Sequence, residues 1–174
     1  MRPVQGINKL FLFQIEGDAE TAFKVAFQRD HSTEESRSYD TEGTIDGNIK
    51  VTGDYEASHS LTTFEAHGDT LVKRIREECL RDRNPKRLKV WELDRTELPE
   101  VGDESSTIPG DFSLDVVTSM PKSSSYDGSV EITIDTEVEG TIVSGEVTVT
   151  EELLDILKQT DAQLREFEQP NLTP

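Results

Sequence analysis

The sequence contains one cysteine, few aromatic residues and no long hydrophobic run. Cys79 is the only cysteine among the 174 residues, so it has no partner for an internal disulfide. It lies on the apolar face of an expected helix, which favours a small buried residue over a reactive thiol. The apolar run at 10–13 is too short for a signal peptide or a membrane span. We therefore expect synthesis and folding in a cytoplasm, with no membrane partner.

Motifs that usually mark an active site are also missing. The chain has no HExxH, CxxC, GxSxG or glycine-rich phosphate loop. His31, His59 and His67 are isolated in the sequence and lack the spacing of zinc ligands. Composition alone does not exclude a Ser-His-Asp set, whose members meet only in space. The sequence therefore predicts no enzyme, no catalytic or metal-binding residue and no cofactor.

Basic residues are scarce relative to acidic ones. The chain has 36 aspartates and glutamates but only 18 lysines and arginines, which gives a net charge of −18 and a pI near 4.4. Such a surface repels phosphates, which argues against DNA binding as the main role but not against DNA passing by. Alternatively, the charge only keeps the monomer soluble.

The few basic residues are unevenly distributed. Eight of the 18 lie between Lys73 and Lys89. A basic patch of this kind suits self-association with an acidic patch on the next copy. The alternative is a solvated helix face whose cations complement the helix dipole. A nucleic-acid site is disfavoured, because only Trp91 supplies an aromatic side chain there.

Alternating apolar and polar residues predict a mainly β (α+β) fold, a sandwich or barrel with a helix packed on it. A helix is expected from Asp69 to Asp82, with Val72, Ile75 and Cys79 on its buried face. A further helix should follow Thr150, and a loop should cover 96–109. The predicted strands are 9–14, 23–28, 58–66, 86–95, 112–120, 130–138 and 146–149.

The segment 31–56 is polar, acidic and rich in glycine. Asp46-Gly47 is a hairpin turn signal between two short apolar stretches. The segment predicts a long hairpin arm with too few apolar residues to pack on its own domain; the alternative is a loose surface loop. The candidate self-assembly contacts on this arm are Tyr39, Ile45, Ile49, Val51 and Tyr55.

Several short motifs follow one another in a recognisable order. A Gly68-Asp69 helix start is followed by the strand Val90-Trp91-Glu92, and the segments 128–132, 138–140 and 145–150 come after it. This order resembles the TP901-1-like family of phage major tail proteins, including its C-terminal layout. The resemblance extends from about residue 4 to residue 152. It implies a tail tube domain at 1–150, including the arm. The residue pattern, outside the resemblance, adds a C-terminal helix with a flexible tail at 151–174.

What this resemblance implies is a structural virion protein. Family members form rings, usually hexameric, which stack into a tail tube around the tape-measure protein and later conduct DNA. The tail terminator and distal tail proteins are further implied partners. The protein would be made in the cytoplasm of a bacterial host and end in the phage tail. On this sequence, the arm and the basic residues Arg81, Arg83, Lys86 and Arg87 are the candidate self-assembly contacts.

Two alternatives remain open at the level of the sequence. A tail terminator or a secretion-system tube subunit shares the fold and would assemble similarly. A virion carbohydrate-binding module would need clustered exposed aromatic residues, whereas Trp91 and the three tyrosines are scattered.

Overall fold

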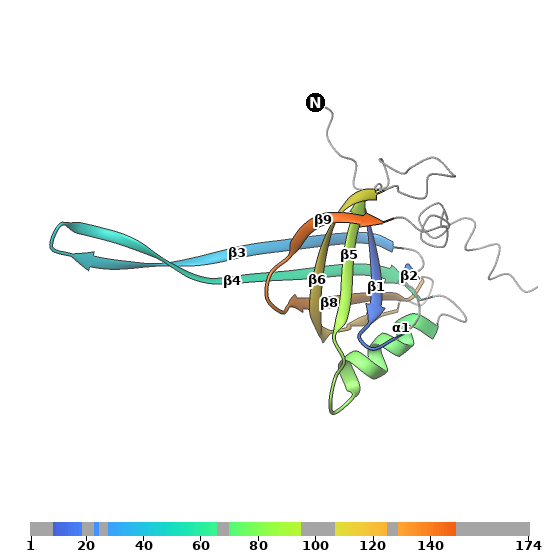
Figure 1. Ribbon diagram of the computed structural model, residues 1–174. Helices are drawn as coiled ribbons and strands as arrows, with labels where there is room; N and C mark the ends of the chain where they lie inside the picture. The colour runs from blue at the N-terminus through green and yellow to red at the C-terminus, as the bar shows by residue number, and fades with distance from the viewer. Residues whose placement is uncertain are drawn as a thin grey trace, which may run out of the picture.

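The computed structural model describes residues 9–18, 23–24, 28–65, 70–94, 107–124 and 129–148 (Figure 1). They form one antiparallel sheet, with a helical segment composed of α1 (Thr70–Arg74) and the π-helical η2 (Ile75–Arg81). The predicted mainly β fold with a flanking helix is confirmed. The strands are β1 (Lys9–Ile15), β2 (Phe23–Lys24), β3 (Gln28–Thr44), β4 (Gly47–Phe64), β5 (Leu88–Asp94), β6 (Thr107–Ser119), β7 (Lys122–Ser123), β8 (Glu131–Val138) and β9 (Val143–Thr148).

The sheet has the strand order β2-β1-β5-β6-β8-β4-β3, while β9 pairs with β6 and β7 with β8. It curls so that β1 comes close to β3 (Figure 1). The side chain of Gln28 bridges these two strands. Its amide oxygen accepts a hydrogen bond from Phe11 N at 3.1 Å, and its amide nitrogen donates one to Phe11 O at 2.7 Å. This side chain therefore satisfies backbone groups where the barrel closes.

The core lies between the curled sheet and the helical segment. Ile132, Ile134 and Thr136 of β8 are buried, as the alternation at 130–138 predicts. The predicted helix face is buried as well, with Ile75 and Cys79 in the main core cluster. Burial raises the pKa of the Cys79 thiol to about 12, so the thiol stays protonated. Cys79 is thus a packing residue, as expected.

Two strands leave the body together. The outer parts of β3 and β4 form a two-stranded ribbon that extends far from the barrel (Figure 1), and we call residues 31–56 the arm. Thr44 pairs with Gly47 across the tip, at the turn predicted from Asp46-Gly47. Gly47 has φ 133°, a conformation that favours glycine. The strand expected from Ser58 is the inner part of β4 and is continuous with the arm.

A β-bulge interrupts the arm partway along its length. Arg37 pairs with Tyr55, whereas Tyr39 pairs with Thr52, so β4 carries one extra residue. Gly53 lies in this bulge. A Cβ atom there would come 2.1 Å from Ser38 Oγ and 3.0 Å from Ser38 O, so a side chain has no room.

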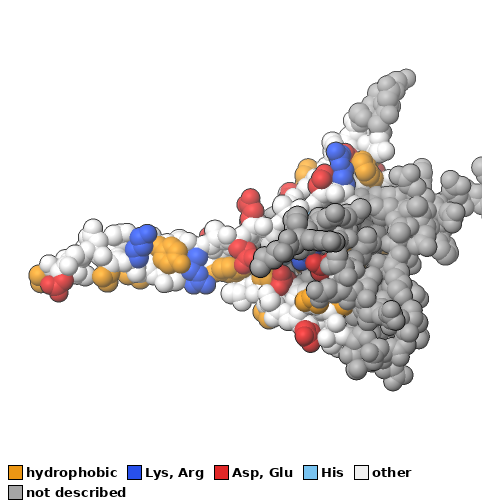
Figure 2. All heavy atoms as spheres, turned by 90° about the horizontal axis from the view of Figure 1, so that it is seen from above, with side chains coloured by type: hydrophobic (Ala, Val, Ile, Leu, Met, Phe, Trp, Pro, Cys, Tyr) orange, Lys and Arg blue, Asp and Glu red, His pale blue; other side chains and the backbone are white. Residues whose placement is uncertain are grey.

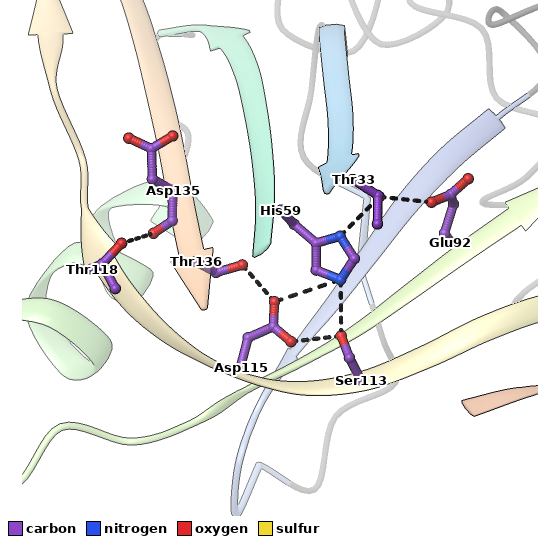
Figure 3. Close-up of polar contacts among 8 residues, drawn as sticks. All are labelled: Thr33, His59, Glu92, Ser113, Asp115, Thr118, Asp135 and Thr136. Carbon is purple, nitrogen blue, oxygen red and sulfur yellow. Dashed lines mark hydrogen bonds and ion pairs between the residues drawn. The ribbon is translucent and has the colours of Figure 1, made fainter. Parts of the chain in front are cut away.

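A buried polar cluster anchors the root of the arm (Figure 3). His59 Nδ1 lies 2.9 Å from Thr33 Oγ1, and His59 Nε2 lies 3.1 Å from Ser113 Oγ. Asp115 is fully buried and accepts hydrogen bonds from the hydroxyls of Ser113 and Thr136. The cluster joins β3, β4, β6 and β8, so it ties both arm strands to the body. His59, which looked isolated in the sequence, is therefore a partnered core residue.

Two strand boundaries predicted from the sequence are wrong. The predicted loop 96–109 is a strand from Thr107 onward, and Ile108 is completely buried because β6 pairs there with β9. Gly145 lies within β9, where it faces Gly110, and does not end the strand. Glycine and proline were expected to stop these strands, but pairing with a neighbour holds them in the sheet.

Several predictions fall outside the described residues. The expected strand 23–28 is described only as β2 and the first residue of β3. The helix start at Asp69 and the C-terminal helix in 151–174 are not among the described residues. Within the described part of the chain, neither helical segment has the length and apolar character that a membrane crossing needs.

The bulge predicts that Gly53→Ala loosens the arm. The added Cβ would overlap Ser38, so we expect amide hydrogen exchange in residues 39–52 to accelerate about tenfold while global stability is unchanged. Gly43→Ala is the matched control, because a Cβ there meets only Asn48 Oδ1 at 3.7 Å. Equal exchange rates in the two variants would contradict this account of the bulge.

The polar cluster predicts that Asp115→Ala destabilises the body. Two buried hydroxyls would lose their hydrogen-bond acceptor, so the free energy of unfolding should fall by about 3 kcal/mol. Urea denaturation followed by circular dichroism measures this change. Asp111→Ala on the same strand is the control, since Asp111 is half-buried and should change stability by less than about 1 kcal/mol. If both substitutions lower the free energy of unfolding equally, the buried cluster contributes no more to stability than a half-buried position on the same strand.

Candidate self-assembly surface

The arm exposes apolar side chains and has no hydrophobic core beside it in which they could be buried. Ile45 at the tip is fully exposed, Tyr39 is 58% exposed and Ile49 is 51% exposed. Val51 is 39% exposed. Figure 2 shows apolar side chains lying open along the arm, between charged ones. An isolated two-stranded ribbon is marginally stable in water, so these side chains favour a partner surface.

The strand register separates these residues onto two faces of the arm. Ile49 pairs with Glu42, and Val51 pairs with Asp40. Directly opposed residues point to the same side of a ribbon, so these four share one face, which we call the Ile49 face. Tyr39 pairs with Thr52 and lies on the other face. The Ile49 face therefore carries two aliphatic side chains on β4 beside two carboxylates on β3.

Tyr55 braces the arm from within. Its hydroxyl donates a 2.7 Å hydrogen bond to Glu35 Oε2, and the Arg37 guanidinium lies 5.6 Å from the ring centre. The hydrogen bond to Glu35 raises the pKa of Tyr55 above its ordinary value, and burial adds to this. Because of the bulge, Tyr55 shares the face of Tyr39 and not that of Ile49.

The basic residues after the helix divide into paired and unpaired groups. Lys86 Nζ lies 2.7 Å from Glu78, and Arg87 makes two hydrogen bonds to Glu139, at 2.6 and 3.1 Å. These bonds raise the pKa of Lys86 and of Arg87 and lower the pKa of each partner carboxyl. Among the described residues, no ion pair involves Arg81, and its side chain is exposed.

Arg83 resembles Arg81 in this respect. It is exposed and forms no ion pair with any residue in the described ranges. Of the four basic candidate contacts, Lys86 and Arg87 therefore hold the chain's own carboxylates. Arg81 and Arg83 carry charges that are available to another molecule.

A groove of about 270 Å³ lies between the helical segment and the sheet; we call it the helix groove. Its apolar lining comes from Val72 and Ile132. Its charged lining is mostly basic and consists of Lys73, Arg76, Arg81, Glu65 and Glu77. Glu65 is already paired with Lys122 at 2.5 Å, so cations dominate the rim. Sequence reasoning missed this groove, because no pattern shows which part of the sheet the helix crosses.

A second groove, of about 700 Å³, lies at the root of the arm. Among the described residues, its charged lining is entirely acidic: Glu34, Glu35, Glu56 and Glu137. The two grooves therefore carry opposite charge.

The cluster at the arm root contains Ser113, His59 and Asp115 but does not form a catalytic triad. In a triad, serine and carboxylate bond different nitrogens of the imidazole. Here Ser113 and Asp115 both lie at Nε2, at 3.1 and 3.9 Å, while Thr33 occupies Nδ1. The Ser113 hydroxyl donates to Asp115 and is buried, so it is not presented as a nucleophile.

The chain is similar in sequence to a curated tail tube protein. The tail tube protein gp17.1* of Bacillus phage SPP1 is 28% identical over 174 residues, which cover 98% of this chain and 61% of that protein. The chain therefore spans about three fifths of the length of this curated relative.

Solved structures show the same architecture. The SPP1 tail tube matches with a TM-score of 0.69 and 22% identity, over 91% of this chain and 87% of that chain. The tail of a gene transfer agent particle matches with a TM-score of 0.58 and 14% identity, over 85% and 100%. At these identities the likeness concerns the fold.

The family assignment rests on the sequence itself. Residues 3–144, most of the chain, match the model of the phage tail tube proteins. This confirms the resemblance seen in the motif order. The chain belongs to the family of phage tail tube proteins, structural components of the virion tail.

Proposed function

We propose that this protein polymerises with itself into stacked rings that form the tail tube of a long-tailed phage, through which DNA leaves the capsid. The observation that carries this proposal is the arm. It exposes apolar side chains on both faces and extends away from the body, so burial of these side chains requires another molecule. In an assembly of identical chains, that other molecule is another copy of the chain.

The edges of the sheet support the same function. β3 is the last strand in the sheet order, and its outer edge has no paired strand among the described residues. Unpaired edges are a ready template for strand addition. Joining such edges between neighbouring copies would satisfy the backbone groups and close a ring around an axis.

The ring is proposed to be hexameric, because the tail of the gene transfer agent particle, which has the same fold, has C6 symmetry. A net charge of −18 suits a conduit that DNA passes without binding. The tape-measure protein, tail terminator and distal tail proteins are the partners proposed with the tube, after synthesis in a bacterial cytoplasm. The fold alone does not separate a tube subunit from a tube cap, since a terminating cap also matches with a TM-score of 0.55. The family match favours the tube subunit.

Concentrating the purified protein tests this proposal directly. We expect a monomer in dilute solution and hollow tubes or rings at high concentration, seen by sedimentation and negative-stain electron microscopy. A small closed dimer that never grows at any concentration would overturn the proposal.

The arm predicts a variant that folds but does not assemble. Ile49→Asp combined with Val51→Asp should raise the concentration needed for tubes about a hundredfold, since burial of two aliphatic side chains contributes roughly 3 kcal/mol. Monomer stability should stay within about 0.5 kcal/mol of wild type, because both residues are exposed. The control is Val116→Asp, an exposed valine on β6 in the body. Wild-type assembly by the arm variant would show that the arm is dispensable.

A further inference from the structure

We propose that the Ile49 face of one copy's arm docks into the helix groove of another copy. This inference rests on the proposed function and adds the identity of the two contacting surfaces. Each surface combines apolar and charged side chains, and the prevailing charge has opposite sign on the two surfaces.

The arm contributes Ile49 and Val51, with Asp40 and Glu42 directly across the ribbon. All four side chains are exposed. Neither carboxylate forms an ion pair with any other described residue. The face therefore offers two aliphatic side chains and two uncompensated negative charges.

The helix groove contributes the complementary chemistry. Val72 and Ile132 form an apolar floor that is only 5% and 1% exposed, and Lys73 and Arg81 supply exposed cations at the rim. Arg76 is half-buried and donates a long, 3.4 Å hydrogen bond to Met120 O. Among the described residues, Lys73 and Arg81 form no ion pair, so their charges are open to a carboxylate from outside.

The arm of a chain cannot bind the helix groove of the same chain. The arm leaves the barrel on one side, and the helical segment lies at the other end of the body (Figure 1). A contact between two different surfaces of identical chains is heterologous, and such contacts generate rings or filaments. The docking contact would thus propagate an assembly and not close a dimer.

The acidic groove at the arm root is the competing receptor and is disfavoured. Its glutamates would face Asp40 and Glu42 on the arm, and like charges brought together are repelled. The charge of the two grooves therefore favours docking of the arm into the helix groove over docking into the acidic groove.

Charge reversal on each surface, alone and combined in one chain, tests the contact. The arm variant is Asp40→Lys with Glu42→Lys, and the groove variant is Lys73→Glu with Arg81→Glu. Each should raise the concentration needed for tube formation at least tenfold, about what is expected when ion pairs become like-charge pairs. The chain with all four substitutions has the wild-type net charge and should assemble within about threefold of wild type.

Sedimentation and negative-stain microscopy measure assembly, and circular dichroism checks that each monomer folds. If the combined chain is as defective as the two parents, the arm docks elsewhere and the inference is overturned. It is also overturned if both parents assemble like wild type. In either case, tubes formed by the wild-type chain leave the proposed function standing. Failure of the wild-type chain to form tubes would remove both.

Discussion

The arm depends on one constraint: its two strands are also strands of the body. The inner part of β4 carries core residues such as Leu61 and pairs with the inner part of β3, while the outer parts of both strands run into solvent. Folding of the barrel therefore fixes where the arm begins and in which direction it leaves. The exposed apolar side chains of the ribbon then follow as a consequence, because a two-stranded element far from the core has nothing to pack against.

Polar packing at the arm root adds specificity to this arrangement. The inward pairs from β4 and β8 change from Thr63–Ile132 and Leu61–Ile134 to His59–Thr136 toward the arm. A buried face already disfavours a slip of one residue, and a buried hydrogen-bond cluster is in addition satisfied in one register only. A slip of one residue would turn His59 outward and leave Asp115 without its neighbours. The cluster thus fixes the register of the ribbon at the point where the core no longer does so.

The sequence predicted those features that depend on local periodicity. The inward face of β8, the buried face of the helix and the turn at Asp46-Gly47 all follow from residues close together in the chain. It failed where distant pairing decides the outcome. Pro109 and Gly145 lie in paired strands because β9 returns to β6, and His59 meets Ser113 from 54 positions away. The helix groove was missed for the same reason, since Ile132 and Lys73 are adjacent only in the fold.

Charge and apolar burial have separate roles in the proposed assembly. A net charge of −18 repels copies at long range, which keeps dilute subunits apart. At contact distance the local pattern matters more, because the acidic arm meets a basic groove and not another acidic surface. At physiological ionic strength, salt largely screens exposed charges that are more than about 8 Å apart, whereas burial of Ile49 and Val51 is not screened. Apolar burial therefore supplies the driving force, and charge determines which surfaces meet.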